Sequence, residues 1–96
     1  MTRFSRYDAA GYLSTPEHAA AYLEAAFEEA GDDAGYIAHA LGTIARSGNM
    51  SELARRTGMS REGLYRALAE DGNPSFATVL KVTRALGLDL KAEAHA

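Results

Sequence analysis

The sequence predicts an all-α protein of five helices, and three observations support this fold class. Apolar residues recur at spacings of three and four along most of the chain, and capping residues and Gly flank these periodic stretches. No stretch with β-strand alternation precedes residue 88. The 96 residues are 47% hydrophobic and 24% charged, a composition that suits one folded core. We therefore expect a helical bundle over 15–88, an N-terminal extension over 1–14 and a C-terminal tail over 89–96.

The first two helices have clear boundaries in the sequence. Thr15 is the expected N-cap and Pro16 the first residue of a helix that ends at Gly31. The Asp residues at 32–33 can cap a second helix, which the Gly and Asn at 48–49 close. The expected buried faces of these two helices consist of Ala19, Tyr22, Leu23, Ala26, Phe27 and Ala30 in the first and Ile37, Ala40, Leu41 and Ile44 in the second.

Three shorter helices are expected in the rest of the bundle. One runs from about Ser51 to Thr57, and the next begins after Ser60 and ends at the Asp-Gly pair at 71–72. The last begins after Ser75 and ends at Gly87. The residues expected on the inner faces of these helices are Leu53, Ala54, Thr57, Leu64, Leu68, Phe76, Val79, Val82 and Leu86.

The segment 50–70, which opens MSELARRTGMSREGLYRAL, has the pattern of a helix-turn-helix. Gly58 stands where the chain must reverse, because glycine adopts positive φ without a steric penalty. Ser60 can cap the second helix of the motif, and Leu64 and Leu68 can anchor it to the core. These anchors decide which residues of the second helix face the solvent.

The outward face of the second helix carries side chains that can read DNA. In a helix-turn-helix the N-terminal part of this helix enters the major groove. Arginine can bind guanine or neutralise a phosphate, glutamate can accept from cytosine N4, and tyrosine can meet a phosphate or a thymine methyl group. Arginines at the end of the preceding helix are placed for phosphates, which position the protein. The predicted DNA-binding residues are Arg55, Arg56, Ser60, Arg61, Glu62, Gly63, Tyr65 and Arg66.

Charge is divided unevenly along the chain. The whole sequence has a formal charge of −3, which argues against a protein coated in basic charge. Residues 1–40 carry two basic and seven acidic groups, a net of −5, whereas residues 41–88 carry seven basic and four acidic groups, a net of +3. The basic half suits a DNA face to which Arg46 can add a phosphate contact. The acidic half is either a solubilising surface or a docking surface for a basic protein, with anchors from aromatic residues at 4–12.

No pattern in the sequence indicates an enzyme. The chain lacks Cys, so it has no disulfide, thiolate metal site or cysteine nucleophile. The histidines (His18, His39 and His95) do not share metal-ligand spacing, and no histidine is placed to activate Ser60. No phosphate-binding glycine loop occurs. We therefore expect no cofactor, no metal and no catalysis. The absence of a long apolar run and of a signal peptide predicts a cytoplasmic protein without a membrane partner.

The chain resembles the addiction-module antidote family, a branch of the Xre/Cro-like helix-turn-helix proteins. The matching features are the opening FSRYDAAGYL, the run SREGLYRAL followed by GNPSF, and the ending KVTRALGLDL. The resemblance implies a five-helix lambda-repressor-like helix-turn-helix domain with an N-terminal extension. It also implies an antitoxin that neutralises a RelE/HigB-like toxin and represses its own operon as a homodimer bound to operator DNA. The link at 47–49 departs from the more basic or plainly helical link that the resemblance implies there.

Three other functions compete with this interpretation. One is a stand-alone prophage-type Xre repressor without a toxin partner. Another is a pure protein-binding module whose helix-turn-helix no longer binds DNA, and the third is a small enzyme. For the homodimer, the expected surface is the last helix, Phe76–Leu86, with the alternating residues Leu88–Leu90, which could pair across a two-fold axis.

Overall fold

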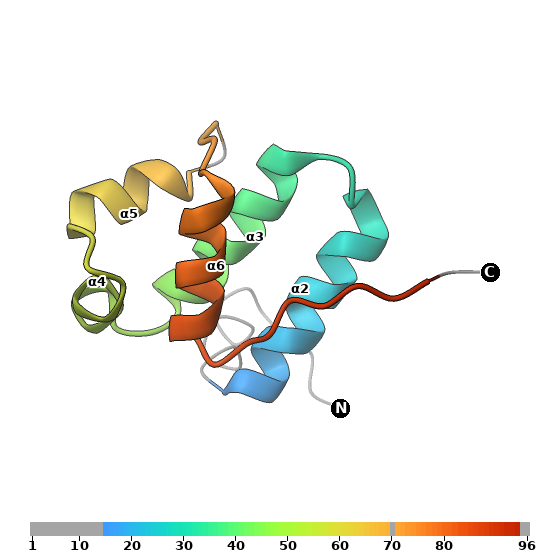
Figure 1. The fold of residues 1–96 in the computed structure, drawn as a ribbon, viewed down its shortest axis with the longest axis horizontal. Coiled ribbons are helices and arrows are strands. Elements are labelled where there is room, and N and C mark those ends of the chain that lie inside the picture. The colour runs from blue at the N-terminus through green and yellow to red at the C-terminus, as the bar shows by residue number, and fades with distance from the viewer. Residues whose placement is uncertain (1–14, 70, 95–96) are drawn as a thin grey trace, which may run out of the picture.

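A computed structural model of the chain describes residues 15–69 and 71–94. The described residues form five α-helices and contain no strand, which confirms the all-α prediction (Figure 1). The aromatic residues at 4–12 that were expected to anchor a partner lie outside the described residues. The helices are α2 (Pro16–Ala30), α3 (Ala34–Arg46), α4 (Met50–Thr57), α5 (Arg61–Ala67) and α6 (Phe76–Ala85).

Side-chain caps fix where the helices begin. Thr15 and Asp33 accept hydrogen bonds from backbone N–H groups three residues ahead, at 3.3 and 3.1 Å, as predicted for α2 and α3. Asn49 was expected to close the second helix, and this was wrong, because its side chain accepts from the N–H of Glu52 at 3.0 Å and so begins α4. The preceding helix ends earlier, at Arg46.

The helix after Ser60 ends at Ala67, several residues before the predicted end at 71–72. Leu68 leaves helical geometry with φ −101° and ψ 15°. Its carbonyl oxygen lies against Gly42 of α3, where an added Cβ would stand 2.5 Å from that oxygen. The carbonyl therefore packs against α3, and the close approach of α3 to Leu68 requires glycine at position 42.

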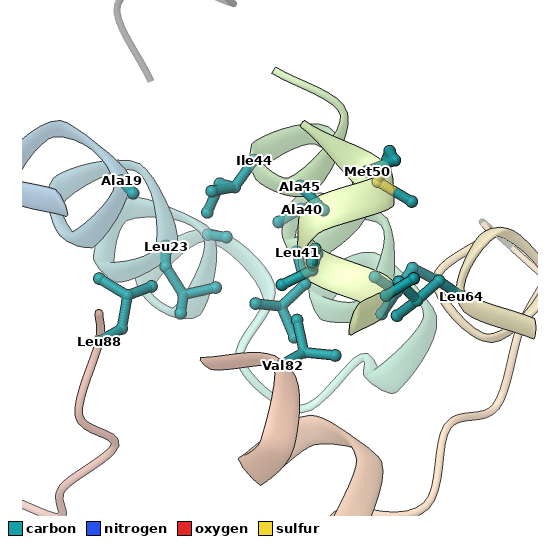
Figure 2. Packing of buried hydrophobic residues seen from close by; sticks show 14 residues of the cluster. Ala19, Leu23, Ala40, Leu41, Ile44, Ala45, Met50, Leu64, Val82 and Leu88 are labelled. Carbon is teal, nitrogen blue, oxygen red and sulfur yellow. The ribbon is translucent and has the colours of Figure 1, made fainter. Parts of the chain in front are cut away.

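A single hydrophobic core joins all five helices (Figure 2). Leu41, Leu64, Leu68 and Val82 are almost completely buried at its centre. Half-buried side chains, among them Met59 beneath the turn, pack against the core from the periphery. The buried apolar members are Ala19, Leu23, Ala26, Ala40, Leu41, Ile44, Ala45, Met50, Leu53, Ala54, Leu64, Leu68, Val82 and Leu88.

Three aromatic residues predicted on inner faces are exposed, so their placement was wrong. Tyr22 is 38% and Phe27 43% exposed on α2, because this helix packs mainly on α3 through a narrow stripe of small residues and one leucine. Phe76 is 71% exposed, because it is the first residue of α6 and lies outside the core that Val82 reaches farther along the helix.

The segment after α6, residues 88–94, is neither helix nor strand, and we call it the C-terminal segment. Gly87 turns the chain with φ 83°, and the N–H of Leu88 donates to the carbonyl of Thr83 at 2.9 Å. The side chain of Leu88 is buried in the core, and Leu90 packs against it. Beyond this turn the C-terminal segment crosses α2 (Figure 1).

Candidate nucleic-acid interface

The candidate interface is built from α4, α5 and the three residues between them. Gly58 has φ 74°, the left-handed conformation predicted for the turn, and an added Cβ there would meet nothing within 4 Å. The N–H of Met59 donates to the carbonyl of Ala54 at 3.1 Å and closes the end of α4. Ser60 then accepts from the N–H of Gly63 at 2.9 Å and caps α5. Local hydrogen bonds therefore fix both the end of α4 and the start of α5 on the two sides of the turn.

The orientation of α5 follows from two leucines. Leu64 and Leu68 are 0% and 1% exposed, as predicted, and hold one side of α5 in the core. The residues predicted to contact DNA from this helix gather on its exposed side, and these are Arg61, Glu62, Tyr65 and Arg66. Gly63 is half-buried, and an added Cβ would lie 3.1 Å from the capping oxygen of Ser60. The structure thus gives these residues one shared surface.

Glu52 is a charged residue beside this surface that sequence reasoning missed. Its carboxylate accepts from Arg55 and, at 3.0 Å, from Nε of Arg56, one helical turn farther along α4. The hydrogen bonds from Arg55 and then Arg56 hold the pKa of Glu52 below its usual value, and the same contact raises the pKa of Arg55. Spacings of three and four on a helix were the signal that could have revealed these pairs.

Arg56 also connects two helices. Its Nη1 donates to the carbonyl oxygen of Ala85 at 3.3 Å, at the C-terminal end of α6. A cation is favourable there because the last carbonyls of a helix carry partial negative charge. The side chains of Arg55 and Arg56 remain 72% and 57% exposed, so both keep surface open to solvent beside α5.

Arg46, the further residue expected near a phosphate, lies at the C-terminal end of α3. Its guanidinium lies over Gly42, where an added Cβ would stand 2.8 Å from Nη1.

An open recess of about 510 Å³ lies beside α5. Its lining includes Arg66, the loop at 71–75 and Thr78. Arg66 therefore lies between the exposed face of α5 and the start of α6.

Over residues 15–69 and 71–94, no group of three or more His, Cys, Asp or Glu residues has the arrangement of a metal site. His39 is half-buried on α3, where its backbone carbonyl accepts from the hydroxyl of Thr43 at 3.1 Å. None of the helices in this part of the chain is long and apolar enough to cross a membrane.

Comparisons with known proteins give the chain relatives over nearly its whole length. The model of a family described as "Probable addiction module antidote protein" matches residues 3–94. An "Uncharacterized protein" of Haemophilus influenzae (strain Rd) is 47% identical over 87 residues, which cover 91% of this chain and 88% of the relative. No solved structure matches the chain.

Proposed function

The chain belongs to the family of probable addiction module antidote proteins, and from this we propose that it is the antitoxin of a type II toxin-antitoxin module. In this proposal it neutralises a RelE/HigB-like toxin by direct binding. It also represses its own operon as a homodimer that binds operator DNA in a sequence-specific manner through α4 and α5.

The exposed side of α5 is the observation that carries the DNA part of the proposal. Its buried leucines fix the helix, so Arg61 and Arg66 project from one rigid, capped element. A major groove accepts a helix of this kind, and arginine binds guanine there with two hydrogen bonds. One domain offers only a few phosphate contacts, so a homodimer on half-sites about 34 Å apart would supply affinity.

The family and the charge distribution support the proposed binding of a toxin. An antidote requires a toxin partner, and a toxin that cleaves RNA must carry positive charge near its active site. Over residues 15–45 this chain has six acidic residues and no Lys or Arg. Such complementarity speeds association and adds specificity.

A mobility-shift titration with the DNA upstream of the gene tests repression. We expect Arg61→Ala/Arg66→Ala to weaken retardation by about tenfold or more, because two base or phosphate contacts are lost. Lys81→Ala/Lys91→Ala removes the same charge from exposed positions outside α4 and α5 and serves as the matched control. Equal losses of DNA affinity in both double variants would indicate non-specific electrostatic attraction. A wild type that does not retard the DNA at low salt would contradict the proposed DNA binding.

Co-expression with the product of the neighbouring reading frame tests the antitoxin role. We expect a small basic protein that co-purifies with this chain and whose toxicity the chain suppresses. A chain that retards its upstream DNA and has no such partner is instead a stand-alone prophage-type repressor.

A further inference from the structure

An open groove of about 420 Å³ lies between α2 and the C-terminal segment. In Figure 1 this segment crosses α2 at the end of the molecule away from α5. The groove is thus separate from the candidate nucleic-acid interface. Its walls are formed by Ala20, Leu23, Glu24, Phe27, Leu88, Asp89, Leu90, Lys91, Ala92 and Glu93.

The groove has an apolar floor with one prominent aromatic ring. Leu23 and Leu88 are buried beneath it, and Leu90 is half-buried at its side. Phe27 lines the groove and is 43% exposed, because it lies outside the narrow stripe that α2 buries against α3. Exposed aromatic side chains beside a concave apolar surface are typical of protein contacts, where such rings supply much of the binding energy.

Acidic groups surround this apolar floor. Glu24, Asp89 and Glu93 line the groove, against Lys91 as the one cation among the lining residues. Arg84 approaches Asp89 at 4.0 Å, with both side chains largely exposed. Counted with Lys91, it leaves the three carboxylates of the groove with a net charge of −1.

The acidic charge continues along α2. Glu17, Glu24 and Glu28 share one side of this helix, because spacings of seven and four return to the same face. Among the described residues, none of these carboxylates forms a salt bridge with Lys or Arg. The groove therefore attracts a cationic surface and repels an anionic one.

The charge decides which occupant fits. A second copy of the chain placed on the groove would bring two acidic rims together, and like charges in an interface oppose association. A partner segment with an apolar anchor flanked by Lys or Arg would satisfy both the floor and the rim. We propose that this groove is the docking site of the toxin, which inserts such a segment beside Phe27. This inference rests on the antitoxin function proposed above.

The position of the groove has a consequence for regulation. The C-terminal segment, which forms one wall of the groove, runs away from α5 toward the other side of the molecule (Figure 1), so one chain can hold operator DNA and toxin together. The toxin would then join the repressor on DNA without displacing it.

The probe for this proposal is the affinity-tagged product of the neighbouring reading frame, titrated with the full-length chain. Two variants change the groove, Phe27→Ser in its floor and Glu24→Lys/Glu93→Lys at its rim. We expect each to weaken toxin binding by about tenfold or more, since an aromatic anchor is lost or the rim charge is reversed. Phe27→Ser should leave the retardation of operator DNA unchanged, and Glu24→Lys/Glu93→Lys should not weaken it, because added positive charge favours DNA. Binding of the toxin to the wild type should weaken with added salt.

Matched controls lie on or directly after the same helix, outside the groove. Tyr22→Ser removes an aromatic residue of similar exposure, and Glu29→Lys/Asp32→Lys reverses two charges, as the rim variant does, at exposed positions that do not line the groove. We expect both controls to bind the toxin as the wild type does. We also expect the toxin to lower the mobility of the complex between the wild-type chain and operator DNA further, rather than to release the DNA.

Three outcomes would overturn the proposal. If the wild type binds the toxin and the groove variants bind it equally well, the docking site lies elsewhere while the antitoxin function stands. If Phe27→Ser changes the mass of the toxin-free chain in light scattering, the occupant is a second copy. If Phe27→Ser and Arg3→Glu/Arg6→Glu both lower the melting temperature of the toxin-free chain, the occupant is its own segment 1–14. A wild type that binds no neighbouring product contradicts the proposed function itself.

Discussion

The guanidinium of Arg56 donates a hydrogen bond to the carbonyl oxygen of Ala85, with 3.3 Å between Nη1 and O. This contact joins α4 to the end of α6, between two residues that lie 29 positions apart in the sequence. Nε of the same group donates to Glu52 at 3.0 Å, so the side chain is held from two directions. Arg56 therefore has a structural role in addition to any contact with phosphate.

Replacing Arg56 with Ala is expected to lower the free energy of unfolding by about 0.5–1 kcal/mol, because an exposed hydrogen bond to a helix end is modest in strength. Urea denaturation measures this loss. Arg55→Ala is the control, since Arg55 shares Glu52 but, among the residues that the structure describes, forms no hydrogen bond with α6. A loss as large for Arg55→Ala as for Arg56→Ala would show that the link to α6 contributes nothing.

If the chain binds DNA as proposed, its affinity for DNA should rise when Glu52 is replaced with Gln. The carboxylate neutralises Arg55 and Arg56 beside α5 and would repel a nearby phosphate. Its removal is expected to tighten binding by about two- to fivefold at low salt and to steepen the salt dependence. Glu29→Gln changes the net charge equally from exposed α2 and should have a smaller effect. Unchanged affinity for Glu52→Gln in a mobility-shift titration would place the phosphates away from α4.

The same ion pairs predict how stability depends on pH. The folded chain holds the pKa of Glu52 below its ordinary value of 4.5, so these contacts add stability above that pH and lose it as the pH falls through the lowered pKa. The wild type should therefore exceed Glu52→Gln in stability at neutral pH, and the difference should disappear in acid. Urea denaturation of both proteins between pH 7 and pH 3 measures it. A difference that does not begin to shrink as the pH falls below 4.5 would contradict the assignment.

The presence of each helix and most of the N-cap residues could be predicted from the sequence, because they depend on residues close together in the chain. Thr15, Asp33, Ser60 and Ser75 cap the helices that follow them, as expected. The end of α5 could not be predicted, because it depends on contact between the carbonyl of Leu68 and a distant helix.

The candidate site was predictable to a similar extent. The exposed face of α5 follows from two leucines on a capped helix, so periodicity was enough to find it. The contact of Arg56 with α6 was not, because sequence spacing says nothing about which helix ends meet. The exposure of Phe27 and Phe76 was missed for a related reason. A helical period shows which residues share a face of a helix, but it does not show how much of that face the neighbouring helices cover.

Two glycines should respond to alanine substitution for different reasons. Gly58→Ala places a side chain at φ 74° in open space, so backbone strain alone should lower the unfolding free energy, by about 1–2 kcal/mol. Gly42→Ala forces a Cβ to 2.5 Å from the carbonyl oxygen of Leu68, and overpacking of this kind costs about 1–3 kcal/mol. Gly58→Asn should recover part of the first loss, because Asn tolerates the left-handed region, whereas Gly42→Asn should not. Equal behaviour of the two Asn variants in thermal unfolding would contradict this distinction.

The cap at Ser60 links stability to the proposed reading of DNA. Its hydroxyl accepts from the N–H of Gly63 at 2.9 Å and holds the first turn of α5, where Arg61 begins the exposed face. Ser60→Ala is expected to lower the unfolding free energy by about 1 kcal/mol and to weaken operator binding, because the first turn of α5 loses its cap. Ser60→Asn keeps a neutral capping side chain and should restore both stability and binding. Restored stability without restored binding would mean that the Ser60 hydroxyl contacts DNA itself, a result that thermal unfolding and mobility-shift titration of the two variants can distinguish.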